Sequence, residues 1–220
     1  QFNAGLSNYN STPSRTMFLG VDSASVAQMG IIPDDMSLAK RINWSVKGRM
    51  LEKKDLAILD IIVTNNWKRP VYFNTTSLNQ VNLTLDKYAL QEGLTYRLLP
   101  VESRSADAGV NTDVMYDNLM NNFHWKGLDD ESVYYSEDYR NFCLNHRASF
   151  GTLAENLIAE GDLERAKEVL LYGLLVIPHE TIPYDNFNVA MIGSLLTVGA
   201  NEEAKKIAEI MAERAQSTLR

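Results

Sequence analysis

Apolar residues in the first half of the chain fall into short runs separated by stretches with helical spacing. The runs at residues 16–21, 70–73 and 95–101 are rich in aliphatic, β-branched or aromatic residues, and each predicts a strand. Apolar positions three or four residues apart predict helices at 24–29, 33–46, 55–65 and 85–91. Because strands that alternate with helices suggest crossover connections, the pattern predicts a small α/β unit with a mainly parallel sheet.

The second half of the sequence shows helical spacing only. Helices are predicted at residues 112–123, 136–160, 163–177, 186–198 and 202–217. Small polar residues at 103–109 mark a domain boundary, and residues 1–15, rich in Asn, Ser and Thr, read as an entry linker. The predicted organisation is a linker at 1–15, an α/β unit at 16–105 and a helical region at 110–220.

Two stretches of the helical region nearly repeat one another. Residues 161–167 (Gly-Asp-Leu-Glu-Arg-Ala-Lys) correspond to 199–205 (Gly-Ala-Asn-Glu-Glu-Ala-Lys), so Ala166 and Ala204 lie 38 positions apart. Each stretch separates two amphipathic runs and predicts the turn of a helical hairpin. Hairpins that recur about every 34 residues are typical of tetratricopeptide arrays, which bind or brace rather than catalyse. The alternative is two unrelated hairpins that share ordinary turn residues.

Small side chains predict where these helices approach most closely. We expect Ala154 and Ala166 to lie between the two helices of the first hairpin, and Gly173 to face the next hairpin. Four leucines are expected to fill the interface: Leu153, Leu157, Leu163 and Leu170.

Composition narrows the possible partners. The chain has 220 residues and a formal net charge of −7, which argues against nucleic acid and against an anionic membrane surface. No apolar run approaches the ~20 residues needed to span a bilayer, so we expect no membrane insertion of this segment. Since the first residue is Gln1 rather than Met, we interpret the chain as a piece of a longer protein.

Residues for metal, cofactor or covalent chemistry are sparse. Cys143 is the single cysteine, so neither an internal disulfide nor a thiolate metal site is expected. The histidines at 124, 146 and 179 fit no ligand pattern and are interpreted as surface or capping residues. Nucleophile-elbow and phosphate-binding glycine motifs do not occur. We therefore expect no metal site, no cofactor and no catalytic residue.

The most distinctive local sequence is Trp-Lys-Arg-Pro-Val-Tyr-Phe at residues 67–73. A tryptophan beside two cations at the mouth of a strand suits stacking of a sugar ring and binding of an anionic group. The predicted ligand-binding residues are Trp67, Lys68, Arg69 and Tyr72. The alternative is structural: Trp67 seals the core, while the two cations cap the preceding helix.

This block belongs to a wider resemblance. Residues 21–30, 54–60, 65–73, 85–88 and 92–101 resemble, in sequence and order, the large bacterial multi-spanning membrane proteins catalogued as domain of unknown function 2723. That family is similar to eukaryotic protein O-mannosyltransferases. The resemblance implies that catalysis lies in an upstream membrane domain. This segment would be its C-terminal soluble region on the extracytoplasmic (periplasmic) face, attached to the inner membrane through upstream spans.

The expected function is accordingly that of an accessory region of a membrane glycosyltransferase. Such a region would bind or position an acceptor polypeptide or glycan, or brace its own upstream membrane domain, and would not be catalytic alone. One alternative is a stand-alone soluble hydrolase or transferase with its site between the two predicted units, for which Asp22, Asp60 and Asp86 are the plausible carboxylates. Another is a purely structural scaffold.

Overall fold

The computed structural model describes residues 14–34, 36–48, 50–102 and 107–218. Nearly all of the predicted linker at 1–15 therefore lies outside the described residues. The fold is mixed α/β with a helical C-terminal part. It divides into two compact units: unit 1 holds the described residues up to Leu90 together with Thr95–Gly109, and unit 2 holds Gln91–Leu94 and the residues from Val110 onward.

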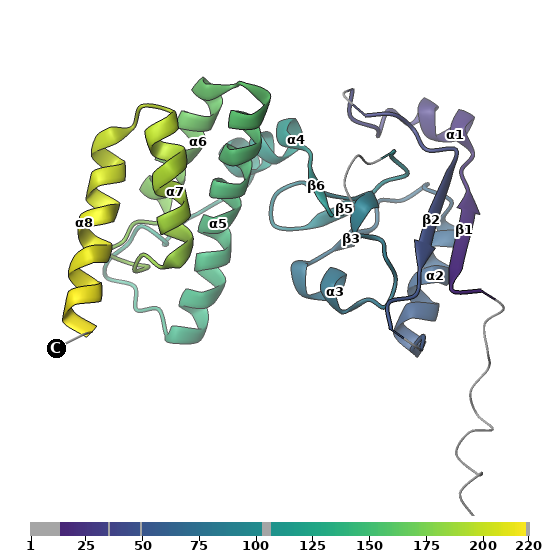
Figure 1. Cartoon of the computed structure of the whole chain (residues 1–220), viewed down its shortest axis with the longest axis horizontal. Coiled ribbons are helices and arrows are strands. Elements are labelled where there is room, and N and C mark those ends of the chain that lie inside the picture. Colours follow the sequence, from purple (N-terminus) through teal and green to yellow (C-terminus); the bar gives the residue numbers. More distant parts are fainter. Residues whose placement is uncertain (1–13, 35, 49, 103–106, 219–220) are drawn as a thin grey trace, which may run out of the picture. The chain divides into compact units, whose positions relative to one another are not determined.

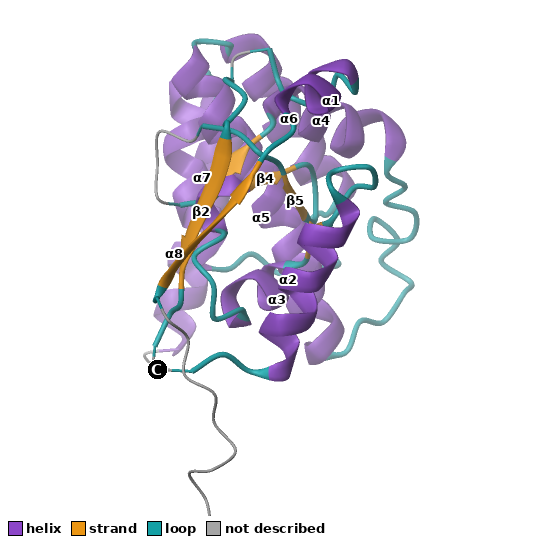
Figure 2. Ribbon diagram, turned by 90° about the vertical axis from the view of Figure 1, so that its right-hand side faces the viewer, coloured by secondary structure: helices purple, strands orange, loops and turns teal. Residues whose placement is uncertain are grey.

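Unit 1 is built from short strands and helices (Figures 1 and 2). Strands β1 and β2 form a two-stranded ribbon, and a second sheet has the order β3-β5-β4-β6. The elements follow the chain as β1 (Thr16–Gly20), α1 (Ser23–Gln28), β2 (Arg41–Ser45), α2 (Lys53–Asn65), β3 (Tyr72–Phe73), α3 (Thr75–Gln80), the 3₁₀ turn η1 (Asp86–Tyr88), β4 (Ala89–Gln91), β5 (Tyr96–Leu98) and β6 (Gly109–Val110).

The prediction of a mainly parallel sheet was wrong for the strand pairs with a defined register. β1 pairs with β2 and β3 pairs with β5, both in antiparallel register. The error arose at residues 33–46 and 85–91, which were predicted as helices but contain β2 and β4. In β2, Ile42 and Trp44 are buried while their neighbours are not, which is the period of a strand. With no helix there, β2 pairs directly with β1.

Helix α2 is tied to the rest of unit 1 by Asp55, which is fully buried. Its carboxylate accepts hydrogen bonds from the backbone N–H of Glu52 (2.7 Å) and from the backbone and side-chain nitrogens of Asn82 (both 2.9 Å). Burial opposes ionisation of Asp55, but the hydrogen bonds from Asn82 and Glu52 outweigh it, so its pKa lies below the ordinary value. The ionised form is therefore part of the folded state.

We expect Asp55→Asn to destabilise unit 1 by about 2 kcal/mol, because the new amide group presents a donor to another donor. A lowered folded-state pKa gives stability that is present above the unfolded pKa of about 3.9 and is lost as pH falls through the folded pKa. Urea unfolding at a series of pH values should thus show a shallower acid loss in the variant. Asp60→Asn, an exposed change on the same helix, is the control. An unaltered acid slope in Asp55→Asn would contradict this role.

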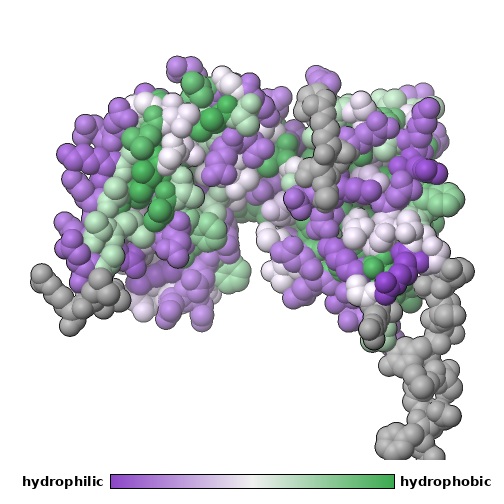
Figure 3. Space-filling view, viewed as in Figure 1, coloured by the Kyte–Doolittle hydropathy of each residue, from purple (hydrophilic) through white to green (hydrophobic). Residues whose placement is uncertain are grey.

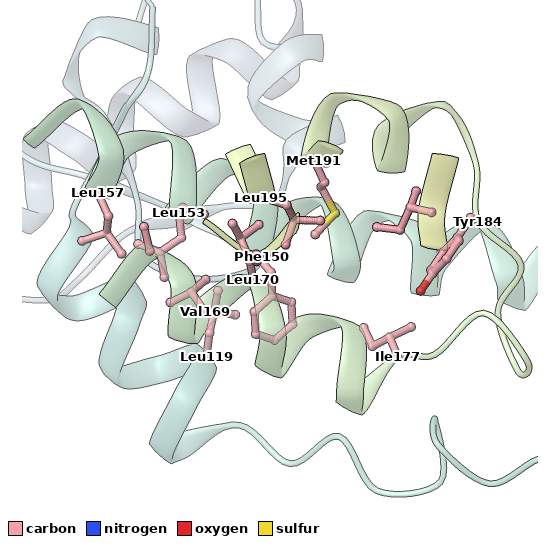
Figure 4. Packing of buried hydrophobic residues seen from close by; sticks show 14 of the residues in the cluster. Leu119, Phe150, Leu153, Leu157, Val169, Leu170, Ile177, Tyr184, Met191 and Leu195 are labelled. Carbon is pink, nitrogen blue, oxygen red and sulfur yellow. The ribbon is translucent and has the colours of Figure 1, made fainter. Parts of the chain in front are cut away.

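Unit 2 consists of helices, and the helices predicted beyond residue 109 are confirmed. α5 packs against α6 and α7, and α7 packs against α6 and α8 (Figure 1). The elements are α4 (Thr112–Asp117), the π-helical turn η2 (Asn118–Asn122), α5 (Glu137–Glu160), α6 (Leu163–Val176), α7 (Asn186–Thr197) and α8 (Asn201–Thr218). Their shared core is drawn in Figure 4.

The turns that join α5 to α6 and α7 to α8 have the same geometry. Gly161 and Gly199 are both left-handed, with φ of 87° and 74°. In each turn the residue after the glycine donates its N–H to a leucine carbonyl at 2.8 Å, Leu157 in the first and Leu195 in the second. These bonds form the helix-ending motif that favours glycine at this position. Ala166 and Ala204, which follow at equal distance, are buried at 0% and 1% exposure.

Two details of the predicted interface differ. Gly173 contacts Phe150 of α5, within its own hairpin, and not the next hairpin as predicted. The glycine that faces the next hairpin is Gly151, where an added Cβ would lie 3.4 Å from Met191 of α7. Leu163 is 44% exposed because it is the first residue of α6, whereas the other three predicted leucines are fully buried.

Candidate ligand-binding site at the end of helix α2

The chain leaves α2 through two consecutive left-handed residues. Asn66 has φ 44° and Trp67 has φ 64°. Asparagine tolerates this conformation, but an aromatic residue adopts it rarely, at a cost of about 1–3 kcal/mol. Trp67 is only 8% exposed and belongs to the apolar core of unit 1. Burial of the indole therefore offsets the backbone strain and fixes the path of the following residues.

The side chain of Asn65 closes this loop. Its Nδ2 donates to the carbonyl oxygen of Arg69 (2.6 Å), and its Oδ1 accepts from the N–H of Arg69 (3.0 Å). The N–H of Lys68 also donates to the Asn65 carbonyl oxygen (3.0 Å). Because one amide side chain holds both polar backbone groups of Arg69, the loop is constrained although it is exposed. Lys68 and Arg69 are thereby placed at the surface.

An open groove of about 560 Å³ lies beside the loop. In the described part of the chain no ion pair joins the side chain of Lys68 or Arg69 to an acidic residue. Apart from these two cations, the residues that line the groove are apolar or carry uncharged polar side chains. The groove thus offers two available cations next to apolar surface, which suits a ligand with a carboxylate or phosphate group. The lining residues are Ile61, Thr64, Asn65, Lys68, Arg69, Pro70 and Val71.

The structure separates the four residues predicted for this site. Lys68 and Arg69 line the groove together. Trp67 lies in the core, so its ring faces pack against protein, in agreement with the structural alternative. Tyr72 is 46% exposed on β3, where the Arg97 guanidinium lies 6.0 Å from the centre of its ring. Tyr72 is therefore near the groove in sequence but is not one of its lining residues.

Sequence reasoning missed the residues that α2 contributes. Ile61 is 51% exposed and lines the groove, but in the sequence it is only one of several apolar residues in the α2 helix, and nothing there marks it as a binding residue. Asn65 was interpreted as part of the helix end, whereas its amide organises the loop. An Asn-Asn pair after an amphipathic helix is the signal that could have indicated a structured left-handed exit.

Of the three carboxylates considered for an enzyme, two have partners that explain them structurally and the third is exposed. Asp22 caps α1, accepting from the N–H (3.2 Å) and hydroxyl (2.6 Å) of Ser25, and these bonds lower its pKa. Asp86 forms an ion pair with Lys47 at 2.8 Å, and Asp60 lies exposed on α2. Among residues 14–34, 36–48, 50–102 and 107–218, no group of three or more His, Cys, Asp or Glu residues is placed to hold a metal ion. Within the same ranges, no helix is long and apolar enough to cross a membrane.

Fold and groove together define a small mixed α/β unit with a basic surface site, followed by helical hairpins. The chain matches the family model described as TMEM260-associated domain 2 over residues 1–118, more than half of its length, and belongs to that family. The match includes the groove at α2 but not the hairpins from α5 onward. No curated protein and no solved structure matches the chain.

Proposed function

We propose that this chain is a non-catalytic accessory region of a membrane glycosyltransferase, on the extracytoplasmic face, and that its groove at α2 binds an acidic segment of the acceptor polypeptide. The observation that carries the proposal is the pair of available cations, Lys68 and Arg69, held at an open groove with apolar walls. The resemblance of residues 65–73 to the family of domain of unknown function 2723 supports the glycosyltransferase context. Membership of a family described as an associated domain is consistent with an accessory role.

We also infer that unit 2 is a pair of tetratricopeptide-like hairpins that serves as a second binding surface. The matching turns and the packing of α5 with α7 support this interpretation. Hydrophobic side chains gather at the surface over α7 (Figure 3), and Val189 and Leu196, two turns apart on one face of this helix, are about half exposed. Contiguous apolar surface rimmed by polar residues is typical of protein-binding sites. A polypeptide is therefore the favoured ligand.

The expected affinity of the groove is modest. An exposed ion pair contributes roughly 0.2–1 kcal/mol, so two cations supply about a tenfold gain in affinity for an acidic peptide. The gain should weaken with added salt, since exposed charges are screened within about 8 Å at physiological ionic strength. Covalent attachment to a membrane domain would raise the local concentration of the acceptor and make such weak binding useful.

Fluorescence anisotropy with a labelled Asp/Glu-rich peptide tests the groove. We expect Lys68→Ala/Arg69→Ala to weaken binding about tenfold, and the Asn/Gln version of the peptide to bind the unaltered chain equally weakly. The matched control is Lys40→Ala/Lys53→Ala, which removes two exposed cations of unit 1 outside the groove. Equal losses in both double variants would reduce the effect to net charge and refute a specific groove. Absence of peptide binding, together with full activity of a parent enzyme truncated at this region, would favour a scaffold.

A further inference from the structure

Unit 2 contains a second, unrelated pocket that no sequence motif indicated. It has a volume of about 360 Å³ and is lined mainly by apolar and aromatic side chains. Ligand pockets range over about 300–1,000 Å³, so this one suits a single side chain rather than a large cofactor. Its lining residues are Leu94, Asn122, Phe123, His124, Trp125, Leu128 and His146, and none of them is an acidic residue, lysine or arginine.

The pocket is formed where a π-helical turn opens into a loop. The N–H of Phe123 donates to the carbonyl oxygen of Asn118 (2.8 Å), five residues earlier, which re-aims the chain at the end of η2. Single π turns of this kind occur frequently at functional sites. Trp125 is then fixed by the bond from its Nε1 to the Leu119 carbonyl oxygen (3.0 Å). Its ring contacts that of Phe123 edge-on, at 6.1 Å between centres.

Gly93 sets the position of one aromatic wall. Its φ is 130°, a region that favours glycine, and an added Cβ would lie 2.9 Å from Cε2 of Phe123. Phe123 therefore occupies space that only a glycine leaves open. The backbone conformation of Gly93 and the close approach of Phe123 to it both place the Phe123 ring in the wall of the pocket.

His146 supplies the polar group of the pocket. Its Nδ1 is buried and has no hydrogen-bond partner among the described residues. Burial lowers the pKa of His146, so the imidazole is neutral at pH 7. An unpartnered lone pair costs less than an unpartnered N–H in such a place, which puts the proton on Nε2. Among the described residues no group bonds to Nε2, and His146 thus offers a donor to the pocket that it lines.

Asn122 offers the complementary acceptor. Its Nδ2 is already used, donating to Asp117 Oδ2 (2.7 Å) and to Asn118 Oδ1 (3.3 Å). The amide oxygen of Asn122 makes no hydrogen bond with the described residues. A donor from His146 and an acceptor from Asn122 together match a hydroxyl group, which accepts one hydrogen bond and donates another.

We propose that this pocket binds the side chain of a tyrosine from a polypeptide partner. The aromatic and leucine walls take the apolar ring, and the phenolic hydroxyl accepts from His146 Nε2 and donates to Asn122 Oδ1. A charged ligand would find no counter-ion in the lining. The inference does not depend on the groove at α2, because each site lies wholly within its own unit.

Titration of the full chain with p-cresol, the tyrosine side-chain analogue, tests the assignment by NMR chemical-shift perturbation. We expect p-cresol to bind at least tenfold more tightly than toluene, which lacks the hydroxyl, and more tightly than methyl glucoside. His146→Phe should bring the p-cresol affinity down to that of toluene and leave toluene unaffected. Tyr139→Phe, a 67% exposed position on the same helix that does not line the pocket, should change neither affinity.

A positioning role for Gly93 gives a second measurement. Gly93→Ala should weaken p-cresol and toluene together, because it displaces the ring of Phe123, while circular dichroism reports whether the helices persist. Equal binding of p-cresol and toluene, or a p-cresol affinity that His146→Phe leaves unchanged, would overturn the proposed hydroxyl recognition. Preferential binding of methyl glucoside would replace the tyrosine by a sugar.

Discussion

Replacing Arg147 with methionine is expected to lower the free energy of unfolding of unit 2 by about 3 kcal/mol. Arg147 is 1% exposed, and its guanidinium donates to the carbonyl oxygens of Ile177 (2.8 and 3.0 Å), Pro178 (3.2 Å) and Ile182 (2.5 Å). It also donates to Oδ1 of Asn188 (3.2 Å). Methionine fills similar space but leaves these acceptors unsatisfied in the interior. The loss of hydrogen bonds should therefore exceed any gain from removing a charge.

Within the described residues no carboxylate forms an ion pair with Arg147, although nearby acidic residues, of which Asp185 has the larger effect, favour its cationic form. The carbonyls of Ile177 and Pro178 follow the C-terminus of α6, where the helix dipole favours a cation, and the guanidinium carbon lies 5.0 Å from the ring centre of Tyr184. Burial lowers the pKa of Arg147 to about 10, so the side chain remains a cation at neutral pH. Arg147 thus connects the first hairpin to the loop that leads into the second.

Arg140→Met is the matched control for this prediction. Arg140 lies on the same helix, its Nε has no hydrogen-bond partner among the described residues, and its guanidinium carbon lies 6.0 Å from the ring centre of Tyr134. Its replacement should cost less than about 1 kcal/mol. Urea unfolding followed by far-ultraviolet circular dichroism compares the two variants. Arg147→Lys should fall between them, since an ammonium cannot reproduce the planar fork. Equal stability of the two methionine variants would contradict the argument.

The helices of unit 2 could be predicted because their signals are local. Gly161 and Gly199 end helices by a conformation that glycine favours, and each is followed by a further amphipathic run. The buried positions in each hairpin then follow from periodicity. Periodicity does not show which neighbouring helix packs against a glycine. For this reason Gly173 was assigned to the next hairpin, whereas it contacts Phe150 of its own hairpin.

The strands of unit 1 were harder because their signals conflict. Residues 38, 42 and 46 have helical spacing, yet the alternation of Ile42 and Trp44 with polar residues belongs to a strand. The pairing of β2 with β1 decides between them, through contacts between residues far apart in the sequence. A local pattern cannot supply such contacts, and short amphipathic runs are therefore ambiguous.

The groove at α2 and the aromatic pocket also differ in how far local sequence could predict them. The basic pair Lys68 and Arg69 is visible as a sequence block, so its groove could be expected. The aromatic pocket joins Gly93 and Leu94 to a loop about thirty residues later and to His146 on α5. None of these residues is distinctive alone. They form a pocket only because the π-helical turn places them around one space.

Gly173→Ala is expected to destabilise unit 2 by about 2–3 kcal/mol, although alanine is the better helix former. An added Cβ would lie 2.7 Å from Cγ and 2.9 Å from Cβ of Phe150. Those atoms are close to the backbone of α5, so relief requires the two helices to separate. Phe150 is fully buried in the centre of the core (Figure 4), and separation would open its contacts with Trp125 and Tyr172.

The same substitution at another helical glycine, Gly193→Ala, is expected to change stability in the opposite direction. Gly193 is exposed on α7, and an added Cβ there would meet no atom within 4 Å. The change should stabilise unit 2 by up to about 1 kcal/mol through helix propensity alone. Thermal unfolding of both variants measures the difference in sign. If both alanines stabilised the chain, α5 and α6 would not pack at Gly173 as the structure has them, and the hairpin on which the proposed binding surface depends would be misplaced. Opposite signs would instead fix the close approach of α5 and α6 as a requirement of the fold.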